Sequence, residues 1–149
     1  MRAVRVIHIA PDTTSTITSK SISKDGGHAA YRGLLKVAKG ATHSKSFVRC
    51  DALLLDQQSR SDTYPSIEID EELVDIGHEA TVSKVSDEQL FYLQSRGIPE
   101  DEARRLVVHG FFADIVRRIG VPELEDRLLK AVEAELEVAV GLPPAGAAR

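Results

Sequence analysis

Three residues of this chain have side chains that bind iron or zinc well: Cys50, His78 and Glu79. Thiolate, imidazole and carboxylate are all competent ligands for these metals. The three residues lie on separate segments, so their spacing alone does not show that they meet. Without further context, Cys50 is more typical of a small buried hydrophobe, His78 of a hydrogen-bonded histidine at a strand start, and Glu79 of a solvated surface charge. Both interpretations stay open at this point.

No common catalytic motif accompanies these residues. The sequence contains no GxGxxG, phosphate-binding loop, GxSxG, HExxH or CxxC. The single cysteine cannot form an internal disulfide, and it excludes a zinc site with two thiolates from one chain. The remaining histidines are scattered, and we interpret them as structural or surface residues: His8, His28, His43 and His109.

The composition is that of an acidic globular protein. The chain has 149 residues and a net charge of −4, with 42% hydrophobic and 28% charged residues. A negative net charge argues against a nucleic-acid partner, whose phosphates require a basic surface. No apolar run approaches the roughly 20 residues that span a bilayer. The start, MRAVRVIHIA, alternates in polarity and does not resemble a secretion signal. We therefore expect a cytoplasmic protein without membrane or nucleic-acid partners.

The elements that must position the candidate ligands change in character near residue 86. Before this point, period-two segments rich in β-branched residues predict strands, with turn signals between them, including one at 62–65. A β-sandwich or barrel and a β-solenoid both fit this pattern. Small polar residues in several strands favour the solenoid, since short stacked rungs tolerate them. The predicted strands are Val4–Ile9, Thr14–Ile22, Ala29–Val37, Ser44–Leu55, Ser66–Ile69 and Thr81–Val85.

After residue 86, the spacing of apolar residues predicts three helices. Ser86 is a suitable N-cap, and Gln89 completes a capping box. Gly97 and Gly120 are typical residues just beyond a helix end. We expect the third helix to end at Gly141 and residues 142–149 to be disordered. The apolar stripe expected on the second helix consists of Ala103, Leu106, Val107, Gly110, Phe111 and Ile115.

Long segments of the chain resemble the SufB/SufD family. The segment GHEATVSKVSDEQLFYLQSRGI, residues 77–98, is similar to the junction between the β domain and the helical domain of that family. CDALLLDQQSRSDTYPSIEI, HIAPDTTSTITSKSIS and YRGL are also similar to family segments. His-Glu-Ala-Thr at 78–81 and the pair Cys50-Asp51 resemble SufB more than SufD. Members are much longer, so this chain matches their C-terminal part, up to about Gly141.

The resemblance implies a fold and a site. It implies right-handed β-helix rungs over residues 1–85 and a small helical domain over 86–141 that docks SufC, an ABC-type ATPase. The residue matching Cys50 is implicated in holding the cluster, and the residue matching Glu79 is an implicated ligand. The residue matching His78 aligns with a histidine that SufD contributes across the subunit interface.

The function implied by the resemblance is that of a scaffold rather than an enzyme. A nascent iron–sulfur cluster would be built on it transiently, with rearrangement driven by ATP hydrolysis in SufC. The implied partners are SufC, SufD or a second SufB-type chain, and sulfur donor proteins. A flavin is a further candidate for the assembled complex, with no residue assigned to it. The alternative is a truncated interaction module that only docks SufC.

Overall fold

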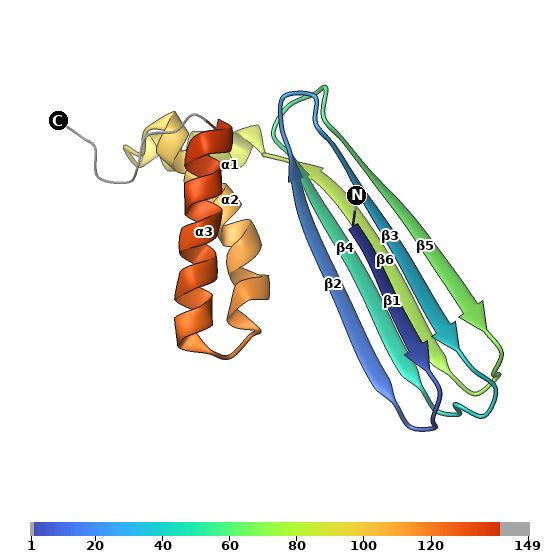
Figure 1. Cartoon of the computed structure of the whole chain (residues 1–149). Helices are drawn as coiled ribbons and strands as arrows, with labels where there is room; N and C mark the ends of the chain where they lie inside the picture. Colours follow the sequence, from blue (N-terminus) through green and yellow to red (C-terminus); the bar gives the residue numbers. More distant parts are fainter. Residues whose placement is uncertain (1, 141–149) are drawn as a thin grey trace. The chain divides into compact units, whose positions relative to one another are not determined.

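The computed structural model describes the backbone of residues 2–140 and the side chains of residues 3–135. The chain divides into two compact units, Met1–Lys84 and Val85–Arg149. In the described part of the chain, the first unit consists of strands and the second of helices (Figure 1). The prediction of a mainly β chain with C-terminal helices is therefore confirmed. The expected helix end at Gly141 and the tail after it lie outside the described residues.

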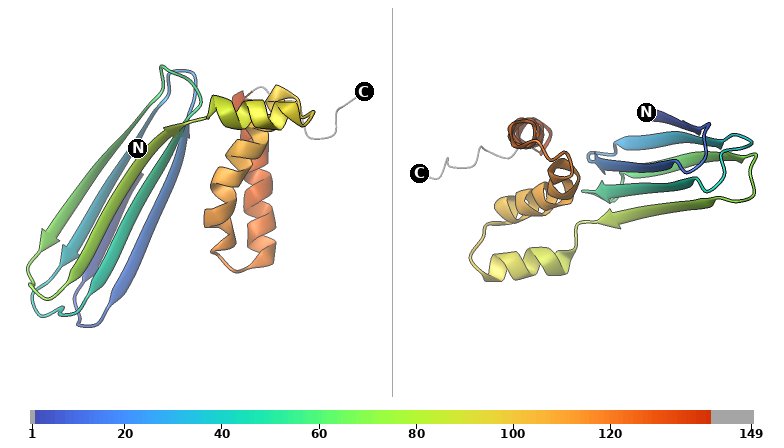
Figure 2. Two further views of the ribbon diagram at one scale, coloured as in Figure 1. Left: turned by 180° about the vertical axis from the view of Figure 1, so that it is seen from behind. Right: turned by 90° about the horizontal axis from the view of Figure 1, so that it is seen from below.

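The strands form two parallel sheets, and successive strands along the chain belong alternately to one sheet and to the other. One sheet has the order β1-β3-β5 and the other β2-β4-β6, so each strand pairs with the strand two places further on (Figures 1 and 2). This order follows from connections that cross from one sheet to the other at every turn. The strands are β1 (Arg2–His8), β2 (Thr14–Ser23), β3 (His28–Val37), β4 (Lys45–Leu54), β5 (Arg60–Ile69) and β6 (Asp75–Lys84).

Hydroxyl side chains stack from one strand to its neighbour. Ser15 Oγ lies 2.8 Å from Ser46 Oγ, and Thr13 Oγ1 lies 2.9 Å from Ser44 Oγ; each pair is 31 residues apart in sequence. Ser44 and Ser46 are buried, so these bonds satisfy hydroxyls that have lost water. Ser15 and Ser46, two polar residues inside neighbouring strands, thus have each other as partners, and Thr13 and Ser44 form a second pair just before the same strands.

The turns stack in the same way. The Asp12 amide donates to the Thr42 carbonyl at 2.9 Å, and the His43 amide donates to the Leu73 carbonyl at 2.6 Å. Asp12 and His43 both have a positive φ, 58° and 56°. Asp and His are among the side chains that occupy this left-handed region more readily than most. The turns before β2 and β4 therefore have a left-handed residue at equivalent positions although their sequences differ.

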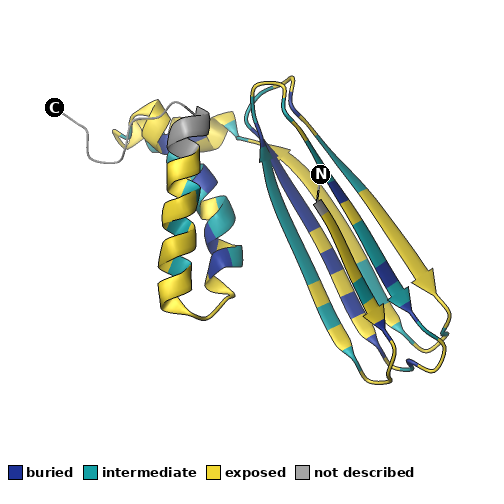
Figure 3. Cartoon of the chain, in the orientation of Figure 1, coloured by how far each residue is buried: buried dark blue, intermediate teal, exposed yellow. Residues whose placement is uncertain are grey.

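The core of the first unit lies between the two sheets and belongs to their central strands. Tyr31 on β3 packs against Val48 and Cys50 on β4, with Ile17 of β2 beside them. The outer strands have a neighbour on one side only, and large parts of β1, β5 and β6 are exposed (Figure 3). The exposed large hydrophobic residues on these three strands are Val4, Ile7, Tyr64, Ile67, Ile69 and Val82.

Two strands are longer than the sequence predicted. The turn expected at 62–65 is wrong, because these residues belong to β5. Pro65 fits there since β5 is an edge strand, where a missing amide proton breaks no ladder. β6 begins at Asp75 rather than near Thr81 and includes Gly77. A Cβ at Gly77 would lie 2.6 Å from Phe47 Cδ2, so the absent side chain makes room for that ring.

The helix ends agree with the sequence signals. Ser86 Oγ accepts a hydrogen bond from the Gln89 amide at 3.4 Å. Gly97 and Gly120 have φ of 86° and 70°, a region that glycine enters without steric cost. The helices are α1 (Asp87–Ser95), α2 (Glu100–Arg117) and α3 (Pro122–Val140).

The single apolar stripe predicted for α2 is wrong. Leu106 and Gly110 are exposed, whereas the buried residues of α2 are Ala103, Val108, Ala113 and Val116. The physical reason is that α2 contacts both α1 and α3. A helix between two neighbours buries positions on more than one side, so one stripe does not describe it.

Gly33→Ala is expected to lower the free energy of unfolding by about 1–3 kcal/mol. A Cβ at Gly33 would lie 2.5 Å from Tyr31 Oη and 2.9 Å from its Cζ, and the ring is buried. Urea unfolding measures the change. In a Tyr31→Val background the same substitution should cost much less, since the clash is gone.

Gly110→Ala is the matched control. Its Cβ would meet nothing within 4 Å in α2, so it should raise stability by up to about 1 kcal/mol. If the Gly33→Ala protein had the same free energy of unfolding as the wild type, this result would contradict the packing of Tyr31 over Gly33.

Candidate functional site

Cys50 is a free thiol inside the first unit. It lies on β4, is 4% exposed and belongs to the same buried cluster as Tyr31 and Val48. Burial raises the pKa of the Cys50 thiol, and the neighbouring carboxylate of Asp51 raises it further. The thiol is therefore protonated at neutral pH, and it binds metal strongly only after it loses that proton.

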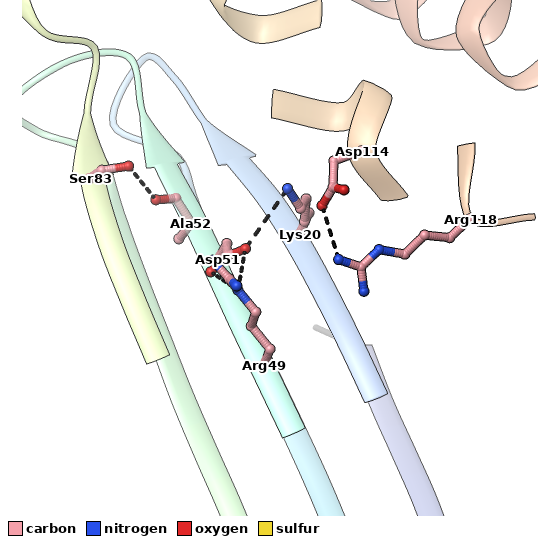
Figure 4. A network of polar contacts seen from close by, with 7 residues as sticks. All are labelled: Lys20, Arg49, Asp51, Ala52, Ser83, Asp114 and Arg118. Carbon is pink, nitrogen blue, oxygen red and sulfur yellow. Dashed lines mark hydrogen bonds and ion pairs between the residues drawn. The ribbon is translucent and has the colours of Figure 1, made fainter. Parts of the chain in front are cut away.

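Asp51 points away from the thiol and is held by two cations. Arg49 Nε donates to both Asp51 carboxylate oxygens at 3.1 Å, and Lys20 Nζ lies 3.8 Å from Oδ2 (Figure 4). Lys20 is the in-register neighbour of Asp51 across the β2–β4 ladder. Local sequence patterns do not reveal these partners of Asp51. Asp62 also has a partner, because His28 Nε2 lies 2.6 Å from its Oδ2.

The register of β4 and β6 places the other candidate ligands. Val48 pairs with His78, Arg49 with Glu79 and Cys50 with Ala80. In-register neighbours share a face of a sheet, and successive residues alternate between faces. His78 therefore lies on the face of Val48 and Cys50, whereas Glu79 lies on the opposite face beside Arg49.

Both ligands on β6 are exposed, because this edge strand has β4 as its neighbour on one side only. Cys50 and His78 are brought to one face of the sheet, and Glu79 is not. Within the described residues, no three His, Cys, Asp or Glu side chains form a group that could hold a metal ion. The three candidate ligands therefore do not form an assembled metal site in this structure.

Tyr31 is the residue near the thiol that sequence reasoning missed. It comes from β3, in the sheet opposite Cys50, and its 19-residue separation from Cys50 is invisible to any local motif. The available signal was Gly33, two residues further along the same strand. A glycine inside a strand often marks the close approach of another group, and here that group is the Tyr31 ring.

The fold and the site together define a class of protein. The chain has paired parallel sheets that exchange strands at every turn, a buried thiol between them, and an appended helical unit. A family profile described as "SUF system FeS cluster assembly, SufBD core domain" matches residues 2–111. The chain therefore belongs to the SufBD family, and the resemblance drawn from its sequence segments is confirmed.

Curated relatives support the same assignment. The chain is 53% identical over 137 residues to an iron–sulfur cluster assembly SufBD family protein of Mycobacterium tuberculosis (strain ATCC 25618 / H37Rv). It is 44% identical over 137 residues to the iron–sulfur cluster assembly protein SufB of Bacillus subtilis (strain 168). Both matches cover 92% of this chain, but only 16% of the first relative and 29% of the second.

No helix in the described part of the chain combines the length and apolar content needed to cross a bilayer.

The Cys50 thiol is expected to make stability fall at alkaline pH. Its pKa is raised in the folded state, so the folded chain holds the proton more tightly than the unfolded chain. The stabilisation that comes from this tighter proton binding is fully present below the pKa of the unfolded thiol, roughly 8.5, and is lost as the pH rises above that value. The free energy of unfolding should fall by at most about 1.4 kcal/mol per pH unit from this group.

Urea unfolding at pH 7.5 and pH 9.5 measures this dependence. Both pH values lie below the pKa of Tyr31, which is also raised by burial. Cys50→Ala lowers stability at both values, because it leaves a cavity, but it should flatten the pH dependence. If the free energy of unfolding changed equally with pH in the two proteins, the thiol would have the same pKa in the folded and the unfolded chain.

Proposed function

We propose that this chain is the part of a SUF scaffold that holds a nascent iron–sulfur cluster, with Cys50 as the thiolate ligand. The observation that carries the proposal is the placement of Cys50 and His78 on one face of adjacent strands in a SufBD-family chain. Iron bound to sulfide favours a soft thiolate, and a transient site benefits from imidazole or carboxylate ligands that release more readily. The cluster is cargo, assembled and then passed on.

The proposed fold is a right-handed β-helix. Alternation of the strands between two parallel sheets, and stacking of turns and hydroxyls between successive strands, support this geometry. Each rung of such a helix adds one strand to each sheet. The edge formed by β5 and β6 then offers exposed apolar side chains, Ile67, Ile69 and Val82 among them, to a SufD or second SufB-type chain.

The site is completed by a rearrangement of β6. Cys50 is sealed from solvent, and Glu79 lies on the other face of the sheet, so the three ligands do not converge in the resting state. An edge strand with a single neighbour moves at lower cost than a central strand. ATP hydrolysis in SufC supplies the work, and the closed state protects the thiol from oxidation between rounds of assembly.

Anaerobic reconstitution of the chain with ferrous iron and sulfide tests this function. The wild-type protein should develop a visible sulfur-to-iron charge-transfer band, and Cys50→Ser should abolish it, because the only thiolate is lost. His78→Ala and Glu79→Ala should lower the iron retained after desalting, because each removes one weaker ligand.

Glu72→Ala is the matched control for Glu79→Ala. Glu72 is exposed and lies between β5 and β6, so the same loss of charge should leave the band unchanged. A wild-type protein with no band, or a Cys50→Ser protein with an undiminished one, would count against Cys50 as a ligand.

A second candidate function, docking of SufC by the helical unit alone, is favoured by one observation. Apolar side chains remain exposed where α2 leads into α3: Ile119, Val121, Leu124 and Leu128. Leu124→Glu with Leu128→Glu should weaken capture of purified SufC by the full chain at least tenfold, because it places two charges in an apolar contact. Titration calorimetry measures the affinity.

Glu123→Gln is the control, since it alters a charge in the first turn of α3 without touching an apolar residue. Unchanged affinity for the double variant would place the SufC contact elsewhere. Capture of SufC by a chain that never retains iron would favour the docking module over the scaffold.

A further inference from the structure

The Tyr31 hydroxyl is buried without a partner. The residue is 6% exposed, and among the side chains that the structure describes its Oη is a buried polar atom with no hydrogen bond. Buried hydroxyls are nearly always paired, because a hydroxyl that loses water without a replacement is costly. Its lack of a partner therefore points to a group that the chain itself does not supply.

The position of Tyr31 indicates where that group binds. The ring lies along its own strand over Gly33, which carries the hydroxyl away from its backbone and along β3. Tyr31 and Cys50 come from opposite sheets and meet in one buried cluster with Val48. The unpaired hydroxyl and the free thiol thus share the space between the sheets, where apolar neighbours strengthen any hydrogen bond.

The chemistry of the two groups favours Tyr31 as a donor. A phenol hydroxyl has one proton to donate, and an anionic sulfur at Cys50 can only accept. No hydrogen bond joins the two residues in the resting structure, which leaves the Tyr31 hydroxyl available to an atom added at Cys50.

We propose that Tyr31 is a positioning residue that donates a hydrogen bond to an anionic sulfur atom bound at Cys50. The inference rests on the proposed function, in which Cys50 holds a sulfur-containing cargo, and it names the group that orients that sulfur. Hydrogen bonds to sulfur stabilise its negative charge, as they do in protein-bound iron–sulfur clusters.

A persulfide on Cys50 tests the proposal without iron. The full chain is treated with sodium tetrasulfide in urea and refolded anaerobically. The Cys50 thiolate attacks a terminal sulfur, one S–S bond of the tetrasulfide breaks, the Cys50 persulfide anion forms and a trisulfide dianion leaves. The tetrasulfide is the oxidant. Removal of the added sulfur by cyanide, followed by intact mass, gives the half-life of the persulfide in each protein.

Tyr31→Phe should shorten this half-life at least about threefold, the effect of losing one hydrogen bond. Tyr64→Phe is the matched control, because it removes the hydroxyl of an exposed tyrosine on β5, and it should leave the half-life unchanged. In wild-type protein labelled with ¹³C at tyrosine Cζ, the Tyr31 resonance should move on loading, while those of Tyr64 and Tyr92 should not. The two Tyr→Phe variants separate the hydroxyl from the packing of the ring, because each of them keeps its ring and loses only the oxygen.

An equal half-life in Tyr31→Phe, an unmoved Tyr31 resonance, or a wild-type protein that cannot refold with the added sulfur would each overturn the proposal. Because the resonance is measured in wild-type protein, the result does not depend on how well Tyr31→Phe folds. If the persulfide behaves as expected but no iron is retained by the wild type, the cluster scaffold function fails and the role of Tyr31 stands.

Discussion

The structure of the first unit depends on one constraint: each strand pairs in parallel and in register with the strand two places along the chain. The intervening strand lies in the other sheet, so equivalent residues of neighbouring strands recur about 31 positions apart. Turns must then stack on turns, and hydroxyls on hydroxyls, or buried polar groups would lose their partners. Asp12 and His43, and Ser15 and Ser46, satisfy this requirement although the sequence shows no visible repeat.

The same constraint decides which side chains are buried. Among the strands that the structure describes, only β3 and β4 have a neighbour on each side, and they supply the cluster that contains Tyr31, Val48 and Cys50. The outer strands β1, β5 and β6 present similar apolar residues to solvent. A cysteine on the central strand is thereby hidden, while the histidine in the next strand, His78, stays accessible.

Alternation along β6 also explains why the candidate ligands do not converge. His78 and Glu79 are adjacent in sequence and therefore lie on opposite faces of one sheet. A pair of neighbouring ligands on a strand serves one metal ion only if the strand twists or if another chain approaches. Under the proposed scaffold function, the cargo would be held when the ligands assemble and released when they separate.

The sequence by itself determined the family, the change from strands to helices near residue 86, the helix ends at Ser86, Gly97 and Gly120, and the identity of Cys50, His78 and Glu79 as candidate ligands. These rest on local chemistry, which neighbouring residues encode. Only the tertiary structure decided that Cys50 is sealed beside Tyr31, that Glu79 lies on the opposite face, and that α2 buries more than one side. Those outcomes depend on register and packing between segments far apart in the chain, and no local pattern records them.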